Sequence, residues 1–345
     1  MRSVFFPGPS FVPPESIAAM SKEIVHHHSQ EFSNVVTNIE NSLKKITSCS
    51  GNVFLHTGSG TSTAESIVDN FVVSIPTTQH LVCCNGRFST RWATLLEQKN
   101  LSVITYIEEY GVSHSPSKLL NILEKNLNIS TVWFVHGETS TGVLNPINDL
   151  IRTVKSFNPS IVCIVDAVSS IGTEIFTFDE WHIDIAFTTS CKGLISPAGL
   201  GCIFTKVGFV GSNENRFSDN FKQDRISQPW TPPIQLYYAF EESLKKICNF
   251  GTERYIQHVA NNKELLCTEL SKNNIAVFGE NTLHSVTVIE LPQKKDFLKN
   301  LHKEYSIKLI GAQDHLQTDY FRIGTFGFIE QNEIEQLISI LSRYY

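Results

Sequence analysis

Two short apolar runs in this 345-residue chain each lead to a side chain that can do chemistry. Residues 161–165 precede the carboxylate of Asp166, and residues 184–189 precede the amine of Lys192. The β-branched residues in both runs predict buried strands. Ligands of open α/β sheets bind at the carboxyl ends of strands, so we expect the acid and the amine to share one crevice. This pairing suits pyridoxal phosphate, which needs a lysine for the imine and an acid for the pyridinium nitrogen.

A glycine-containing turn offers a site for the phosphate of such a cofactor. Residues 53–57 predict a strand, Gly58-Ser59-Gly60-Thr61 follows, and apolar residues then keep helical spacing to Val72. A strand, a glycine turn and a helix start together present free backbone N–H groups and a positive dipole end to an anion. Glycine turns also occur simply to reverse the chain, so both interpretations stay open at this point.

The remaining pattern alternates strands with helices and predicts a mainly parallel central sheet flanked by helices. The expected strands are 81–84, 103–106, 132–135 and 202–205, and the expected helices are 31–46, 87–99, 116–127 and one after Pro146. The loop 136–142 carries three hydroxyl side chains that suit ligand binding, although turn and helix-cap chemistry would explain them equally. The fold class is therefore α/β.

The pattern changes after a long helical region at 234–273, which we expect to break near Gly251. Strands at 275–279, 284–291, 307–310 and 320–323, with helices at 293–305 and from Glu330, predict a smaller C-terminal α+β domain. We expect an N-terminal arm over 1–15 that joins the small domain and the active site, a large cofactor-binding domain over 16–245, and the small domain over 246–345.

Composition restricts the partners and the compartment. The net charge of −6 gives no broad positive field for nucleic acid or anionic lipid, and no apolar run reaches the ~18 residues that span a membrane. The N-terminus resembles no signal peptide, and the eight cysteines lack C-x-x-C spacing. We therefore expect a cytoplasmic protein with free thiols. His26, His27 and His28 do not share a helix face, so we expect no metal site.

Eight segments occur in the order found in one known family. Together they resemble the class V aminotransferases of fold-type-I pyridoxal phosphate enzymes, most closely the alanine/serine–glyoxylate and 2-aminoethylphosphonate aminotransferases. The segments cover nearly the whole chain and are Pro7–Ser10, Gly58–Thr61, Asn85–Phe88, His136–Gly142, Val165–Ser170, Cys191–Gly193, Pro197–Gly201 and Phe321–Gly324.

The resemblance implies a role for each matching position at the cofactor. Lys192 would be the catalytic Schiff-base lysine, with a pKa lowered by the cationic ring, and Asp166 would pair with the ring nitrogen. Phe88 would stack on one ring face and Val168 would pack on the other. The remaining cofactor contacts would come from Ser59, Gly60 and Thr61 at the phosphate, Thr139 near the ring hydroxyl, Cys191 in place of the usual polar residue, and Gln228 and Thr231 reaching the partner subunit's phosphate.

The resemblance also implies the reaction and the assembly. Arg322 would clamp the substrate carboxylate, and Gly8 and Ser10 would line the substrate side. We expect a homodimer that moves an amino group from a small amino acid, alanine- or serine-like, to glyoxylate or pyruvate by a ping-pong mechanism. The alternatives are 2-aminoethylphosphonate–pyruvate or phosphoserine-type transfer, a pyridoxal phosphate lyase or desulfurase, and a non-catalytic dimer. No cysteine follows Cys267, which weighs against a desulfurase.

Overall fold

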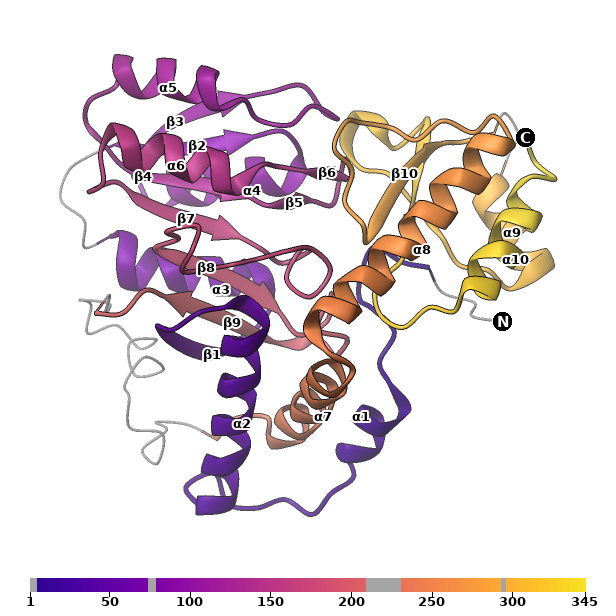
Figure 1. Cartoon of the computed structure of the whole chain (residues 1–345), viewed down its shortest axis with the longest axis horizontal. Coiled ribbons are helices and arrows are strands. Elements are labelled where there is room, and N and C mark those ends of the chain that lie inside the picture. Colours follow the sequence, from indigo (N-terminus) through magenta and orange to yellow (C-terminus); the bar gives the residue numbers. More distant parts are fainter. Residues whose placement is uncertain (1–4, 74–78, 209–230, 293–295) are drawn as a thin grey trace.

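Two β-sheets lie side by side in the computed structural model, which describes residues 5–73, 79–208, 231–292 and 296–345 (Figure 1). Within this described part the larger sheet has seven strands and the smaller has three, and β5 (Gly137–Glu138) and β6 (Val143–Leu144) form a separate two-stranded pair. The order across the larger sheet is β1 (Asn52–Gly58), β9 (Gly199–Thr205), β8 (Ile185–Thr189), β7 (Val162–Asp166), β4 (Ile129–Val135), β2 (Gln79–Cys84) and β3 (Ser102–Ile107).

Five neighbouring strands of this sheet, β3, β2, β4, β7 and β8, run parallel, as the sequence predicts. Strand β9 is antiparallel to both of its neighbours, β8 and β1. The reversal follows from the short connection over residues 190–198, because a parallel crossover needs a dozen or more residues. The prediction of a mainly parallel sheet is confirmed, with a reversed strand near one edge.

Alternate residues of the central strands pack on opposite faces of the sheet. Leu81, Cys83 and Val165 point into one core, and Val82 and Ile164 point into the other. Both faces are covered, which is why these strands read as continuous apolar runs. The first face carries α2 (Gln30–Thr47), α5 (Pro116–Lys125), α6 (Ile147–Phe157) and α7 (Ile234–Phe250), and the second carries α3 (Gly60–Ile67), the π-helical turn Val68–Val72 and α4 (Arg87–Gln98).

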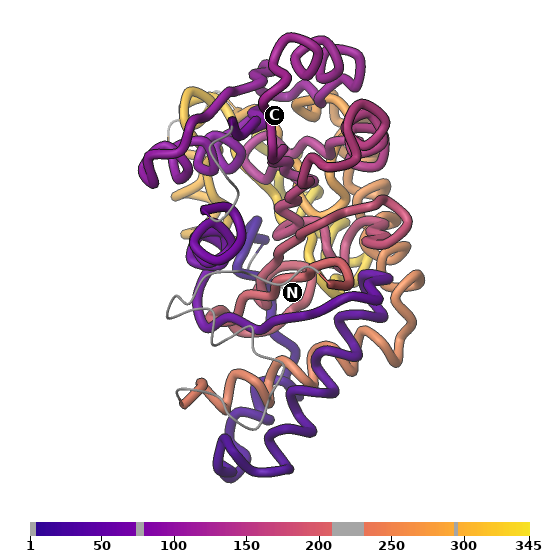
Figure 2. Tube along the Cα trace, turned by 90° about the vertical axis from the view of Figure 1, so that its left-hand side faces the viewer, coloured from indigo at the N-terminus to yellow at the C-terminus, as the bar shows by residue number. Residues whose placement is uncertain are grey.

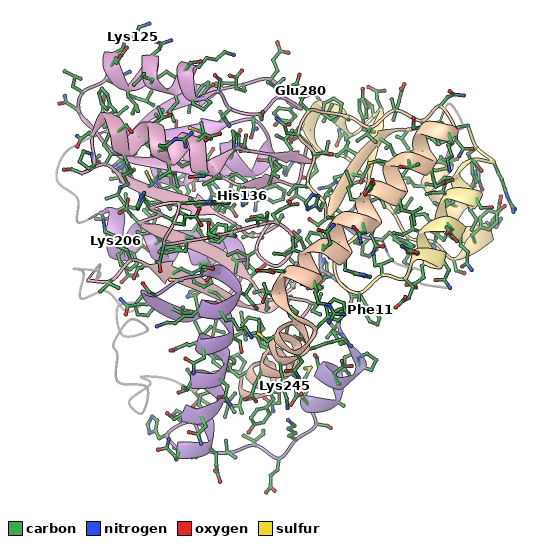
Figure 3. All side chains as sticks on the ribbon, in the orientation of Figure 1. Phe11, Lys125, His136, Lys206, Lys245 and Glu280 are labelled. Carbon is green, nitrogen blue, oxygen red and sulfur yellow. The ribbon has the colours of Figure 1, made fainter. Side chains whose placement is uncertain are left out.

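Three helices that are far apart in sequence pack together. Helix α2 lies alongside α7 in both views (Figures 1 and 2), and α1 (Pro14–Ala19) also packs on α7. Lys245, on α7, lies at the periphery of the molecule, whereas His136, at the end of β4, lies in the interior (Figure 3).

The smaller sheet is antiparallel, in the order β10 (Val286–Glu290), β12 (Tyr320–Gly324) and β11 (Ile310–Gly311). Its core is shared with α8 (Thr252–Lys272), α9 (Phe297–Tyr305) and α10 (Gln331–Leu341). The predicted α+β character is confirmed, and the predicted helix break is observed at Gly251. The strand predicted at 275–279 is wrong, because that segment makes a single bridge, Val277 to Ile289. The strand predicted at 307–310 is observed as β11, which is shorter and begins only at Ile310.

The N-terminal segment connects the smaller sheet to the larger one. The Phe5 N–H donates to Lys308 O at 3.2 Å, and Gly324 N–H donates to Phe5 O at 2.9 Å, so Phe5 bridges the end of β12 and the segment that leads into β11. A Cβ atom at Gly324 would overlap the backbone of Phe6, which makes the glycine necessary for this close approach. Beyond Phe5 the chain runs toward Lys192.

Candidate active site

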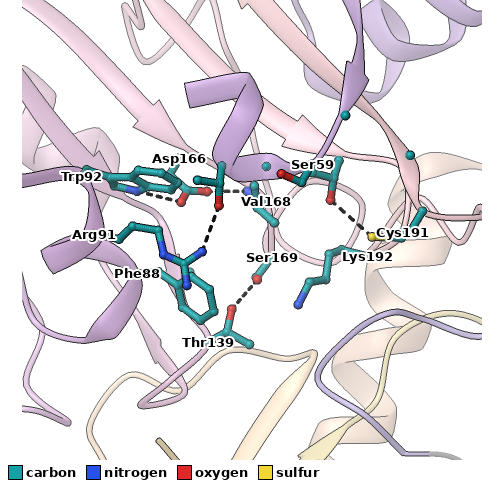
Figure 4. Close-up of a pocket in the computed structure, with 17 residues that line it drawn as sticks. Ser59, Phe88, Arg91, Trp92, Thr139, Asp166, Val168, Ser169, Cys191 and Lys192 are labelled. Atoms are coloured by element: carbon teal, nitrogen blue, oxygen red, sulfur yellow. Dashed lines mark hydrogen bonds between the residues drawn. The ribbon is translucent and has the colours of Figure 1, made fainter. Parts of the chain in front are cut away.

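A cavity of about 420 Å³ opens where β7 and β8 end and where α3 and α4 begin (Figure 4). The cofactor residues predicted from the sequence converge on it, with Phe88 and Lys192 entering from opposite sides. Nine of them line it, namely Ser59, Gly60, Thr61, Phe88, Thr139, Asp166, Val168, Cys191 and Lys192. The carboxyl ends of neighbouring strands therefore do bring the acid and the amine together.

Asp166 is the last residue of β7 and is 4% exposed. Its Oδ1 accepts the Val168 N–H and its Oδ2 accepts the Trp92 Nε1–H, each at 2.9 Å. Burial raises the pKa of Asp166 to about 7, and the charge of Glu138 acts in the same direction, while the two hydrogen bonds oppose the shift. A carboxylate in this state is suited to share a proton with a ring nitrogen.

Lys192 lies three residues beyond the end of β8, and its Nζ donates to the carbonyl of Pro7 on the N-terminal segment. The Nζ also lies 5.6 Å from the ring centroid of Phe326. Burial lowers the pKa of Lys192 to about 8, and the charge of Arg322 adds to this effect. The lowered pKa predicted for this lysine thus arises in the protein itself, chiefly by burial, and a fraction of the amine is neutral near pH 7.

The first turn of α3 forms the third wall of the cavity. Ser59 caps this helix: its Oγ accepts the Ser62 N–H at 3.2 Å, and its own N–H donates to Ser62 Oγ at 2.8 Å. The first N–H groups of a helix have no acceptor within it, so those of Gly60 and Thr61 can serve a bound anion. A Cβ at Gly60 would come within 3.2 Å of Val168, so a glycine fits best here.

Helix α4 contributes residues that the sequence interpretation missed. Arg91 Nη1 donates to Thr61 Oγ1 at 3.0 Å, and its guanidinium carbon lies 4.9 Å from the Phe88 ring centroid (Figure 4). Trp92 holds Asp166, as described above. Phe88, Arg91 and Trp92 are spaced i, i+3 and i+4 on one helix face, and that spacing was the available signal. Ser169, which is hydrogen-bonded to Thr139 Oγ1, also lines the cavity.

These features match the parts of pyridoxal phosphate one by one. The α3 N-terminus with Arg91 suits a phosphate, Phe88 offers a flat apolar face to a ring, Asp166 suits a ring nitrogen, and Lys192 suits an aldehyde. The cavity also has room for a cofactor of this size within its 420 Å³.

Comparison with known proteins decides the family. The family model described as aminotransferase class V matches residues 7–310. The chain belongs to the class V aminotransferases. Enzymes of this class use pyridoxal phosphate, so the cofactor expected from Asp166 and Lys192 is confirmed.

Three similar proteins illustrate the relationship. A serine–glyoxylate aminotransferase of Methylorubrum extorquens is 30% identical, and the match covers 98% of this chain and 89% of the relative. A crystal structure of an alanine–glyoxylate aminotransferase from Nostoc sp. has a TM-score of 0.91 at 24% identity, covering 99% of this chain and 95% of that one. An aspartate aminotransferase from Thermus thermophilus also has a TM-score of 0.91, at 23% identity over 99% of each chain. The predicted fold type is confirmed.

In this aminotransferase, Glu138 fixes the position of Phe88. The carboxylate is fully buried and accepts the Ser89 N–H at 2.9 Å, the Ser140 N–H at 3.1 Å and the Phe88 N–H at 3.4 Å. It therefore satisfies the orphan N–H groups at the start of α4 and interacts favourably with the helix dipole. Gly86 has to be small because a Cβ there would overlap the Glu138 carboxyl group.

The predicted substrate residues flank Lys192. Arg322, 4% exposed, donates from Nε to Gly311 O at 3.2 Å and from Nη1 to Gln313 Oε1 at 3.3 Å. Burial lowers its pKa to about 10, and no carboxylate of the described residues lies within ion-pair distance of it. The Gly8 backbone packs against the Lys192 side chain, and Ser10 Oγ is buried without a hydrogen-bond partner in the described part.

One predicted cofactor residue of the described part lies away from this cavity. Thr231 is exposed and is absent from the cavity lining. Gln228 lies outside the described residues. None of the eight cysteines, all of which are described, forms a disulfide. Within the described ranges, we find no helix long and apolar enough to span a bilayer and no group of three or more metal-ligating side chains.

Proposed function

We propose that this aminotransferase moves an amino group from a small amino acid, such as alanine or serine, to glyoxylate or pyruvate in a ping-pong cycle. The single observation that carries the proposal is the buried guanidinium of Arg322, which has no carboxylate partner among the described residues and lies in electrostatic reach of Lys192. A buried cation in this state favours an anionic ligand. The serine–glyoxylate and alanine–glyoxylate activities named for the two relatives above support small substrates.

Each protein group would have a distinct task in this reaction. Pyridoxal phosphate, when bound, supplies the aldehyde that takes up the amino group and a ring that accepts electrons from Cα. Arg322 would bind and orient the substrate carboxylate. Lys192, with its pKa lowered to about 8, would move a proton at the substrate Cα, and Asp166 would hold a proton at the ring nitrogen.

The remaining lining residues would hold and orient the cofactor. Phe88 and Val168 would pack on the two faces of the ring. The phosphate and the ring substituents would be bound by Ser59, Gly60, Thr61, Thr139 and Cys191, and the substrate side would be closed by Gly8 and Ser10.

We propose a homodimer in which Gln228 and Thr231 of one subunit reach the cofactor phosphate of the other. Exposed apolar side chains near the N-terminus support an interface there: Phe11, which is labelled in Figure 3, is 50% exposed, Ile17 is 56% exposed and Ile24 is 58% exposed. We also propose a cytoplasmic location, which the eight cysteines without disulfides support. The helix break at Gly251 supports a division into an arm over 1–15, a large domain over 16–245 and a small one over 246–345.

The decisive experiment compares Lys192→Ala with Lys245→Ala, which removes an exposed lysine of α7. Cofactor-loaded enzymes are mixed with alanine, serine and 2-aminoethylphosphonate, and the oxo products are identified. We expect the Lys245→Ala enzyme to form pyruvate from alanine and the Lys192→Ala enzyme to form none. Turnover by Lys192→Ala, or preference for the donor without a carboxylate, would contradict the proposal. A subunit of 38.8 kDa that elutes as a monomer would contradict the dimer.

A further inference from the structure

The segment between β11 and β12 contacts two arginines through consecutive residues. Gln313 Oε1 accepts from Arg322 Nη1 at 3.3 Å. The next residue, Asp314, accepts from Arg87 Nη1 at 2.6 Å through Oδ1 and from the Tyr110 hydroxyl at 3.0 Å through Oδ2. Asp314 thus links the smaller sheet to the start of α4, beside the residue that holds Arg322.

This arrangement places a second cation close to the substrate arginine. Gln313 and Asp314 are adjacent, with Cα atoms about 3.8 Å apart, and the two arginines that they hold lie within electrostatic reach of each other. Consistent with this, the charge of Arg87 contributes to lowering the pKa of Arg322. Arg87 also directly precedes Phe88, which lines the cavity.

The two arginines differ in how their charge is balanced. Arg87 is paired with Asp314, whereas Arg322 has no carboxylate partner among the described residues. The side chains of Arg87 and Asp314 are 46% and 32% exposed, and ion pairs at this level of exposure typically contribute little to the stability of a fold. The pair therefore matters more for the charge offered to a ligand than for folding.

We propose that Asp314 is a specificity-determining residue that selects substrates with one negative charge, because it occupies Arg87 and presents a carboxylate to any second acidic group. The inference rests on the proposed function, in which Arg322 binds the α-carboxylate. An acidic donor such as aspartate would bring its second carboxylate toward Asp314, where like charges repel. The positive charge of Arg87, which could otherwise attract this carboxylate, is already neutralised by Asp314.

The test measures kcat/KM for aspartate and for alanine with cofactor-loaded enzymes. Asp314→Asn keeps the shape of the side chain and an acceptor for Tyr110, but releases the charge of Arg87. We expect the aspartate/alanine ratio to rise about tenfold or more in this variant, and to rise less at high salt because exposed charges are screened. Arg87→Gln leaves the carboxylate unpaired, so we expect the ratio to fall. The double variant should return toward the wild-type ratio.

Tyr110→Phe is the matched control, because it removes a hydrogen bond to Asp314 without changing any charge; its ratio should stay within about twofold of wild type. A ratio unchanged in Asp314→Asn and in Arg87→Gln, in enzymes that still use alanine, would overturn this inference alone. The inference would also be overturned if Tyr110→Phe changed the aspartate/alanine ratio as much as Asp314→Asn does. A wild-type enzyme that uses neither alanine nor serine would instead overturn the proposed function, and this inference with it.

Discussion

Replacing Glu138 by glutamine should test whether this carboxylate anchors the start of α4. The carboxylate lies at the start of this helix, and each of its oxygens accepts a backbone N–H: Oε2 that of Ser89 at 2.9 Å, and Oε1 that of Ser140 at 3.1 Å. A glutamine amide has only one oxygen. In either orientation, a buried backbone N–H would therefore face an NH₂ group.

The magnitude follows from the interactions that would be lost. A charge-assisted hydrogen bond contributes about 1.5–3 kcal/mol, and the favourable interaction with the helix dipole contributes about 0.3–1 kcal/mol. We therefore expect Glu138→Gln to lower the free energy of unfolding by roughly 2–4 kcal/mol. Cofactor affinity should fall as well, because the same carboxylate accepts the N–H of Phe88 at 3.4 Å.

Urea unfolding of the apoenzyme, followed by tryptophan fluorescence, would measure the change. Glu97→Gln is the matched control, because Glu97 is an exposed residue of the same helix and should change stability by less than about 0.5 kcal/mol. If Glu138→Gln is as stable as this control, the carboxylate does not anchor the helix start, and the reasoning above is refuted.

Three further changes test other parts of the site. Trp92→Phe removes the donor to Asp166, so cofactor affinity at neutral pH should fall about tenfold; an unchanged dissociation constant would show that this bond is dispensable. In the apoenzyme, the rate of cofactor capture should rise about tenfold per pH unit until about pH 8, where Lys192 becomes neutral, and a rate independent of pH would contradict that assignment. Gly201→Ala would bring a Cβ to 3.1 Å from Thr63 Cβ and should destabilise the fold by about 1–3 kcal/mol in the same urea assay.

The sequence was sufficient where local pattern determines position. Asp166 and Lys192 could be brought together from sequence because the strands that carry them are short and apolar and end where a parallel sheet binds ligands. The reversal of β9 was also accessible, since nine residues between Thr189 and Gly199 are too few for a parallel crossover. The alternation of strands and helices alone does not indicate this length, and so the antiparallel strand was missed.

Other features depend on contacts between distant segments. Glu138 lies in a segment whose sequence reads as turn chemistry, yet it caps a helix that starts 51 residues earlier, at Arg87. Nothing local distinguishes a carboxylate that caps its own helix from one that caps another. Likewise, the bond from Trp92 to Asp166 requires knowledge of which face of α4 meets the sheet.

The path of residues 5–10 has a consequence for how members of this family are recognised in genomes. Pro7 accepts from Lys192, Ser10 N–H donates to Cys191 O at 2.8 Å, and Phe5 is hydrogen-bonded to the smaller sheet. A homologue trimmed at its start codon would keep every cofactor motif and would score as intact in a motif search. It would nevertheless lack the stretch that covers its lysine. Proteins predicted from a start codon placed too late would therefore be mistaken for functional enzymes.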